Sequence, residues 1–294
     1  MTSVAVVAHT GKSLGGGLTE LRTLLAAEGV VDPLWYEVPK SKRAPKCVRK
    51  ALSAGADLVF VWGGDGMVQQ CIDVAAGSNA TIAILPAGTA NVFATNIGIP
   101  KDLGAAVAIG LHGGRHAFDV GVINGERFAV MAGAGFDALM IRDADGGLKD
   151  RFGRAAYIWT GAKHLRSKRV GVRIRVDGSK WFEGKASCVL VGNVGKLMGE
   201  VNAFPDARPD DGQLEIGVVT AYGAWQWLRT LARTAAGGAE RSPFVNVTHG
   251  KKFDVRFAKK TAYELDGGDR KPASRLRFRV EPGAVTVCVP VPSA

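Results

Sequence analysis

In DLVFVWGGDG, residues 57–66, an apolar run ends in a glycine-rich turn. Residues 57–62 are mostly β-branched or aromatic, as in a strand buried inside a parallel sheet. Apolar residues then recur at helical spacing over 68–76, so the turn joins a strand to the start of a helix. Such a turn either is simply tight or holds a phosphate, because glycine lets backbone N–H groups approach an anion at a helix N-terminus.

Two neighbouring strands end in similar turns. Residues 81–85 are apolar and continue into LPAGTAN (85–91), and residues 3–9 continue into HTGKS (9–13). The carboxyl ends of parallel strands meet at one edge of a sheet, where such sheets bind ligands. We therefore expect these three loops to converge on one anionic ligand. None of them is a Walker A loop, because the G-x-x-x-x-G-K-[ST] pattern is absent.

The pattern of secondary structure changes near residue 118. Before it, strands alternate with helices, which predicts a parallel sheet with helices on its faces. After it, short strands separated by glycine turns predict an antiparallel sandwich, interrupted by helices at 154–165 and 224–234. The strands expected there are 118–123, 127–132, 170–176, 185–192, 212–219, 253–258, 275–280 and 284–289. We predict a Rossmann-like α/β domain over 1–118 and a β-rich domain over 119–294, leaving open whether the last strand returns to the first domain.

The composition limits the partners. With 38 basic and 27 acidic residues the chain carries +11, which favours anionic partners. Aromatic residues are only 7% of the chain and do not interleave with basic ones, so we do not expect nucleic acid binding. The four cysteines are far apart, which suits a reducing cytoplasm. No apolar stretch approaches the roughly 20 residues of a membrane span, so we expect any lipid to be met from the surface.

Several motifs together resemble the diacylglycerol kinase catalytic domain family, which includes bacterial soluble lipid kinases and sphingosine kinases and is related in fold to NAD kinases. GGDG and LPAGTAN carry the resemblance in the first half. In the second half it rests on FDVG (118–121), GAGFD (133–137), VGN (191–193), PDDGQLE (209–215) and LDG (265–267). The resemblance implies an ATP-binding domain, a lipid-substrate domain and ATP-dependent phosphorylation of a hydroxyl of diacylglycerol or a related lipid.

The resemblance also assigns roles to individual residues. It implies that Asp266 is the general base and that Asp269 replaces a family glutamate. It implies a Mg²⁺ site formed by Asp211 and the main-chain oxygens of Arg208 and Gln213, with Asp119 joining its water network toward Asp65. ATP would bind along the three loops, at Thr10, Gly11, Lys12, Ser13, Gly63, Gly64, Asp65, Gly66, Met67, Gln69, Gly88, Thr89 and Asn91.

Three positions depart from the family pattern. Met67 replaces the threonine of GGDGT, Val92 replaces an aspartate, and Gly268 replaces the glutamate of Asp-Gly-Glu. These departures leave open a catalytically impaired nucleotide or lipid sensor, and an NAD-kinase-like enzyme with a soluble substrate is the other alternative. The partner we expect is a lipid substrate at a membrane surface, met by a cytoplasmic protein that is peripheral at the inner face. A homodimer remains open.

Overall fold

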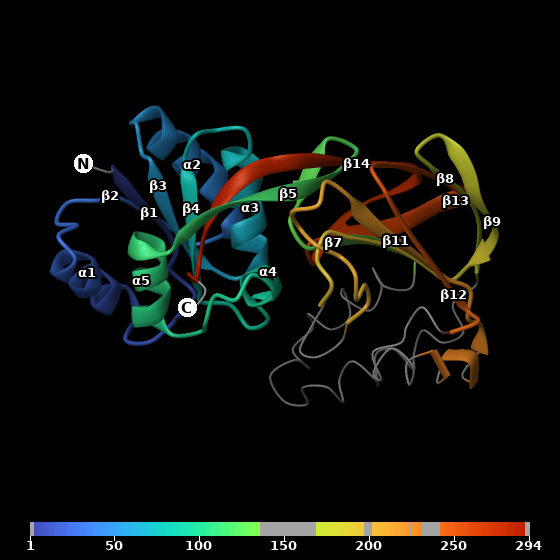
Figure 1. Ribbon diagram of the computed structural model, residues 1–294, viewed down its shortest axis with the longest axis horizontal. Helices are drawn as coiled ribbons and strands as arrows, with labels where there is room; N and C mark the ends of the chain where they lie inside the picture. Colours follow the sequence, from blue (N-terminus) through green and yellow to red (C-terminus); the bar gives the residue numbers. More distant parts are fainter. Residues whose placement is uncertain are drawn as a thin grey trace. The chain divides into compact units, whose positions relative to one another are not determined.

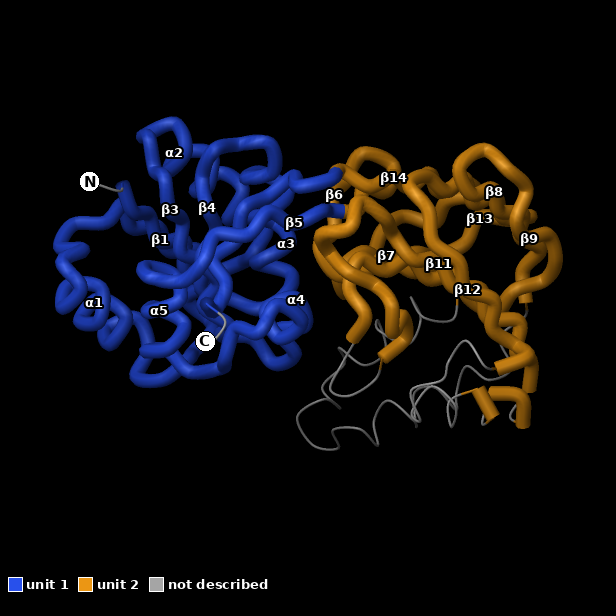
Figure 2. Tube along the Cα trace, in the orientation of Figure 1, with its two compact units in different colours: residues 1–120, 282–294 blue, residues 121–281 orange. Residues whose placement is uncertain are grey.

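The chain folds into two compact units, which Figure 2 shows in different colours. The structure is a computed structural model, and it describes residues 3–135, 169–196, 202–223, 225–227, 229–230 and 242–291. Unit 1 comprises residues 1–120 and 282–294, and unit 2 comprises residues 121–281. Two strands, β5 (Gly114–Ile123) and β14 (Gly268–Val289), contribute residues to both units.

Unit 1 is a parallel sheet covered by helices. Its strands follow the order β14-β4-β3-β1-β2, and every neighbouring pair is parallel. In Figure 1, α1 and α5 lie together on one side of this sheet, and α2 and α3 lie together on the other. The bounds are β1 (Val4–His9), α1 (Gly17–Ala27), β2 (Leu34–Val38), a 3-10 turn (Ser41–Arg43), α2 (Ala44–Ser53), β3 (Leu58–Gly63), α3 (Asp65–Ala75), β4 (Thr81–Pro86), α4 (Val92–Asn96) and α5 (Leu103–His112).

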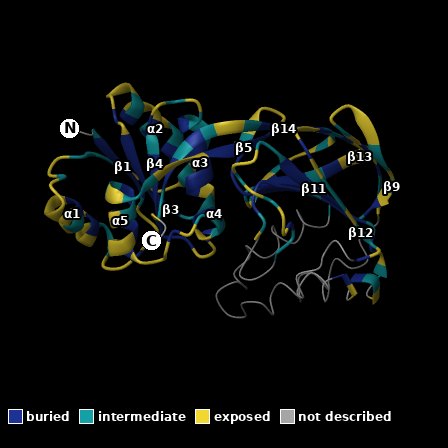
Figure 3. Cartoon of the chain, viewed as in Figure 1, coloured by how far each residue is buried: buried dark blue, intermediate teal, exposed yellow. Residues whose placement is uncertain are grey.

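The apolar run at residues 57–62 forms the central strand of this unit, β3. All six residues of β3 are buried, since β3 lies between β1 and β4 with helices on both faces. Figure 3 shows these strands buried and the outer surfaces of α1 and α5 exposed. In the described ranges, no helix has both the length and the apolar character needed to span a bilayer.

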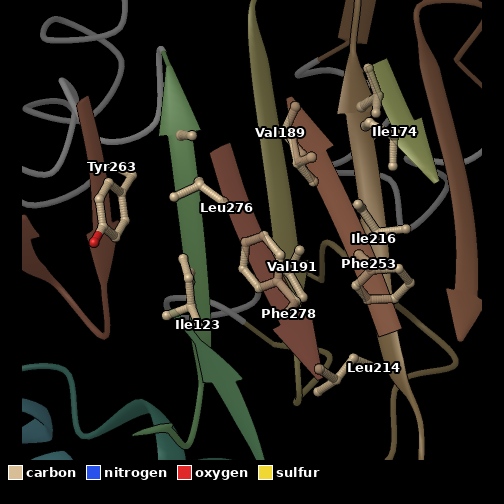
Figure 4. Packing of buried hydrophobic residues seen from close by; sticks show 14 of the residues in the cluster. Ile123, Ile174, Val189, Val191, Leu214, Ile216, Phe253, Tyr263, Leu276 and Phe278 are labelled. Atoms are coloured by element: carbon tan, nitrogen blue, oxygen red, sulfur yellow. The ribbon is translucent and has the colours of Figure 1, made fainter. Parts of the chain in front are cut away.

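Unit 2 is antiparallel and β-rich. Strands β12, β11, β10, β7, β13 and β14 follow one another, while β8 pairs with β13 and β9, and β6 pairs with β5. Figure 4 shows the core, in which Phe253, Phe278 and Ile216 pack among aliphatic side chains. The bounds are β6 (Glu126–Phe128), β7 (Met131–Gly135), β8 (Val170–Val176), β9 (Ser179–Ala186), β10 (Cys188–Gly192), β11 (Leu214–Val219), β12 (Val245–Gly250) and β13 (Lys252–Leu265).

The structure confirms the predicted fold class, and it differs from the expected strands in several places. Strand β9 had not been predicted as a separate strand, and β13 continues to Leu265, beyond the expected residues 253–258. Residues 127–132 divide between β6 and β7, and β12 had not been predicted because its residues alternate without strong apolar character. Residues 275–280 and 284–289, expected as two strands, belong to one strand, β14, which runs through Pro282 and Gly283. These two residues lie between the part of β14 that pairs with β13 and the part that pairs with β4. The helix expected at 154–165 lies outside the described residues, and that at 224–234 lies partly outside them.

Candidate functional site

Two glycines bring the loops after β3 and β4 into contact. A Cβ atom added at Gly88 would lie 2.4 Å from the Cα atom of Gly64, and one added at Gly64 would lie 3.0 Å from the Cα atom of Gly88. Side chains of any size are therefore excluded at this point, where the backbones of the two loops touch. The result is a backbone-lined cradle at the carboxyl edge of the sheet, beside the N-terminus of α3.

Asn91 fixes the second loop from inside. Its side chain is buried, and its backbone adopts a left-handed conformation with φ of 51°, which asparagine tolerates better than most residues. Its Oδ1 accepts the Gly88 N–H at 2.9 Å, and its Nδ2 donates to the carbonyls of Pro86 (3.1 Å) and Gly88 (2.9 Å). Asn91 therefore shapes the cradle rather than presenting its amide to a ligand.

Asp65 begins α3 at the cradle. It is half-buried, and its Oδ1 accepts the backbone N–H of Phe93 at 3.4 Å. Burial raises the pKa of the Asp65 carboxyl above its ordinary value, although nearby backbone N–H groups, that of Phe93 foremost, oppose the rise. The carboxylate thus joins the start of α3 to the start of α4.

The loop after β1 is exposed and attached to its neighbours. The Thr10 N–H donates to the Val38 carbonyl at 3.0 Å, and the buried Trp62 indole donates to the Lys12 carbonyl at 3.1 Å. Thr10, Gly11, Lys12 and Ser13 all face solvent, as do Gly66 and Thr89. Trp62 belongs to β3, so this loop and the Gly64 loop lie at the same edge of the sheet.

Two residues expected at the nucleotide site have buried side chains. Met67 is 1% exposed and packs on Gly63, where an added Cβ would lie 2.5 Å from the Met67 Cβ and Cγ atoms. Its N–H already donates to the Gly64 carbonyl at 2.9 Å. Gln69 is also buried, and its Oε1 accepts a hydrogen bond from Gln70. The Met67 side chain thus packs against the end of β3, and the Gln69 side chain accepts a hydrogen bond from within α3.

The segment expected to bind metal lies in unit 2, before β11. Asp211 is exposed and its Oδ1 accepts the Gln213 N–H at 2.9 Å, which orients the carboxylate; Arg208 is also exposed. A neighbouring group had not been predicted: Glu215, a buried acid inside the apolar strand β11. Burial raises the pKa of the Glu215 carboxyl above its usual value, His249 opposes this, and the charges of Asp211 and Asp206 add to it.

Among the described residues, no group of three or more His, Cys, Asp or Glu side chains is arranged to hold a metal ion, although this segment carries oxygen donors of the kind that Mg²⁺ prefers. Three carboxylates, those of Asp206, Asp211 and Glu215, interact electrostatically there, and carbonyl and carboxylate oxygens are the ligands this cation prefers. Asp119 lies elsewhere, in the unit 1 part of β5. It is 3% exposed, and its Oδ1 accepts the Gly283 N–H at 2.7 Å.

Asp266 occupies the tight turn between β13 and β14. Leu265 pairs with Gly268, and the two residues between them have φ of 44° and 78°, as in a type I′ hairpin. The Oδ1 atom of Asp266 accepts hydrogen bonds from the N–H groups of Val130 (3.0 Å) and Met131 (2.8 Å), and its Oδ2 atom accepts one from the N–H group of Ala129 (2.8 Å). The carboxylate therefore joins this hairpin to the start of β7.

Asp269, the other expected catalytic carboxylate, lies at the start of strand β14 and is exposed. No hydrogen bond or ion pair of its side chain occurs within the part of the chain that the structure describes. The two acids predicted together thus differ: Asp266 is engaged by backbone donors, and Asp269 is accessible.

Family models match both units. A model described as "Diacylglycerol kinase catalytic domain" matches residues 6–123, and one described as "YegS C-terminal NAD kinase beta sandwich-like domain" matches residues 130–289. A Pseudomonas aeruginosa protein named "Probable lipid kinase YegS-like" is 31% identical and aligns with 99% of this chain and 95% of its own. A Bacillus subtilis protein named "Diacylglycerol kinase" is 27% identical over 76% of this chain and 75% of its own.

Solved structures share the fold. A diacylglycerol kinase from Bacillus anthracis superposes with a TM-score of 0.79 at 22% identity, covering 98% of this chain and 96% of that one. An NAD kinase from Archaeoglobus fulgidus in complex with ATP gives a TM-score of 0.51 at 11% identity, covering 98% of this chain and 93% of that one. At these identities the likeness concerns the fold.

Proposed function

This chain belongs to the diacylglycerol kinase catalytic domain family, and we propose from this premise that it transfers the γ-phosphoryl group of ATP to a hydroxyl of diacylglycerol or a related lipid. The family and the relatives make it a phosphotransferase of the lipid-kinase type. We propose in addition the identity of the lipid acceptor, the binding of Mg²⁺ and the roles of individual residues.

The observation that carries the proposal is the cradle between Gly64 and Gly88. The backbones of two loops touch there at Gly64 and Gly88, and α3 begins at the same point. Backbone N–H groups and a helix N-terminus favour a phosphate chain. Thr10, Lys12, Ser13 and Thr89 are exposed around the same edge and would line the rest of the nucleotide.

Catalysis would rely on positioning and charge neutralisation, as phosphoryl transfer does generally. Asp211 and the main-chain oxygens of Arg208 and Gln213 would hold a structural Mg²⁺, with Asp119 in its water network. A Mg²⁺ ion that accompanies ATP would neutralise charge on the phosphates. Either Asp266 or Asp269 would accept the proton of the lipid hydroxyl.

The test is a transfer assay on the purified full chain. γ-Labelled ATP and Mg²⁺ are incubated with diacylglycerol in uncharged detergent micelles, with a lipid extract, and with NAD. We expect label in a lipid product. Label in NAD alone would replace the proposal with a soluble-substrate kinase. ATP binding by calorimetry without any transfer would replace it with the nucleotide sensor that buried Met67 and Gly268 permit.

The two candidate bases are separated by Asp269→Asn. Asp269 is exposed and makes no side-chain bond in the described residues, so this change leaves the fold intact. If Asp269 is the base, turnover falls about 10²–10⁴-fold while the KM for ATP is unchanged, and the acidic limb of the pH–rate profile disappears. Unchanged turnover in Asp269→Asn assigns proton transfer to Asp266.

The metal proposal is tested by Asp211→Asn. Asparagine keeps a side-chain oxygen for the Gln213 N–H but removes the carboxylate charge. Mg²⁺ alone should raise the melting temperature of the wild type, since a cation relieves the repulsion around Glu215, and should not raise that of the variant. Asp32→Asn, an exposed acid in unit 1, is the matched control and should respond like the wild type. An equal response of all three proteins would contradict this site.

A further inference from the structure

Unit 2 carries an open hollow of about 730 Å³ that is lined by residues of β8, β13 and β14 and of the turn between β5 and β6. We name its charged lining the arginine face: Arg175, Lys252, Asp254, Arg275, Arg277 and Arg279. The face follows from strand periodicity. In β14, Leu276, Phe278 and Val280 are buried in the core, and the alternate arginines point outward.

The charges of the arginine face do not cancel. Arg275 binds Asp254 through two hydrogen bonds of 2.8 and 2.7 Å, and Arg279 contacts Glu281. Arg175, Lys252 and Arg277 are exposed, and their side chains form no ion pair within the described ranges. Three cationic groups thus remain available at one hollow.

Two hairpin turns hold these cations in place through their backbones. Asn124, with φ of 49°, accepts the Arg277 N–H at 3.0 Å, and its own N–H donates to the Arg277 carbonyl at 3.0 Å. Asp177, with φ of 48°, accepts the N–H of Lys252 at 2.8 Å. The turns fix the backbone positions of Arg277 and Lys252 and leave their cationic side chains available to an anion.

We propose that the arginine face docks unit 2 on an anionic phospholipid surface, with Arg175, Lys252 and Arg277 contacting headgroup phosphates. The proposal rests on the proposed function, because a lipid kinase must reach an acceptor that lies in a membrane. Charge complementarity selects the occupant: the available groups are all cations, and the aromatic residues of the hollow, Phe253 and Phe278, are buried in the core and offer no surface for stacking nucleic acid bases.

The test is vesicle co-sedimentation of the full chain without ATP. Phosphatidylcholine vesicles are compared with vesicles that also contain phosphatidylglycerol. The variant Arg175→Gln/Lys252→Gln/Arg277→Gln removes three charges and keeps every backbone hydrogen bond described above. We expect its partition onto the anionic vesicles to fall on the order of 100-fold, since each charge near an anionic surface contributes about a factor of five.

The matched control removes three charges from unit 1, as Lys46→Gln/Arg49→Gln/Lys50→Gln on the exposed side of α2. It should bind anionic vesicles nearly as well as the wild type. Equal losses in both variants would show diffuse attraction by a +11 chain and overturn the proposal. If the variant Arg175→Gln/Lys252→Gln/Arg277→Gln lost binding to a short DNA duplex but kept binding to anionic vesicles, the proposal would be overturned in favour of nucleic acid.

A transfer assay separates this proposal from the proposed function. With diacylglycerol in uncharged micelles, the arginine-face variant should match the wild type, and with anionic vesicles it should be slower. A wild type that binds anionic vesicles but labels no lipid in either form would leave the docking surface standing and remove the kinase function.

Discussion

Gly88 is the position of the cradle at which an added side chain would be tolerated least. Its missing side chain lets the loops after β3 and β4 touch, and its N–H and carbonyl both bond to Asn91. The Gly-x-x-Asn spacing was visible in the sequence, but its reason was not. A glycine can serve a positive φ, a turn or a close approach, and only the neighbouring loop shows that this one serves a close approach.

Gly88→Ala should damage both fold and nucleotide binding. The new Cβ would lie 2.4 Å from Gly64 Cα and 2.6 Å from Asn91 Oδ1, so the loops must separate. We expect a loss of about 1–3 kcal/mol in the free energy of unfolding, measured by urea denaturation, and weaker ATP binding by calorimetry. In the control Gly104→Ala, on α5, the Cβ has ordinary contacts, so stability should hold or rise. Wild-type ATP affinity in Gly88→Ala would contradict the cradle.

Asp266→Asn should destabilise unit 2 whether or not Asp266 takes part in catalysis. Its carboxylate accepts three backbone N–H groups, and an amide NH₂ would face at least one of these donors. We expect a cost of about 1–3 kcal/mol, seen as a lower melting temperature. The free energy of unfolding of Asp269→Asn should lie within about 0.5 kcal/mol of the wild-type value. A normal melting temperature for Asp266→Asn would refute the structural role and make its turnover a direct test of the base.

At the scale of elements, the β13–β14 ladder is held on its outer face by Asp254. Hydrogen bonds from Arg275, with further help from Arg256, lower the pKa of the Asp254 carboxyl to about 2. The unfolded chain therefore binds this proton at a higher pH than the folded chain does. The stability that Asp254 contributes is present above its usual pKa of 3.8 and is lost as the pH falls toward 2.

Asp254→Asn should remove this part of the acid dependence. At neutral pH we expect the variant to be about 1 kcal/mol less stable, a modest value because the pair lies at the surface. Urea midpoints measured from pH 7 to pH 2 should draw together for the two proteins below about pH 3.8 and nearly coincide at pH 2. A difference that stays constant down to pH 2 would rule out the Arg275 pair as its source.

At the scale of the whole molecule, unit 1 depends on the end of the chain. Residues 282–294 return to it after unit 2 is complete, and β14 pairs with β4 at Thr286 and Val287. Val285, Val287 and Cys288 are at most 2% exposed there. The edge of the parallel sheet is therefore completed by residues that follow the β-rich unit in sequence.

Truncation after Glu281 should destabilise unit 1 by several kcal/mol. It uncovers β4 as an edge strand and removes two buried valines, each contributing roughly 1.5–3 kcal/mol. Hydrogen exchange should show lost protection in β4 and β3. Truncation after Val291, an exposed residue beyond the last strand, should leave both strands protected. Full protection of β4 after the longer truncation would show that unit 1 does not need β14.

Periodicity and glycine turns are local properties of the chain, so the amino-acid sequence alone predicts the fold class and the motif positions. It identified the loops after β1, β3 and β4, and it predicted glycine turns between the strands of unit 2. The surroundings of each side chain follow from the packing of the folded chain. Met67 packs into the core, Asn91 shapes its own loop, Asp266 binds the backbone of β7, and Glu215 sits among other carboxylates. Apart from the Asn91 bonds, which lie within one loop, these contacts join residues from different loops and strands, so no local pattern encodes them. The arginine face is likewise a product of pairing, since β8, β13 and β14 bring together charges that lie about 100 residues apart.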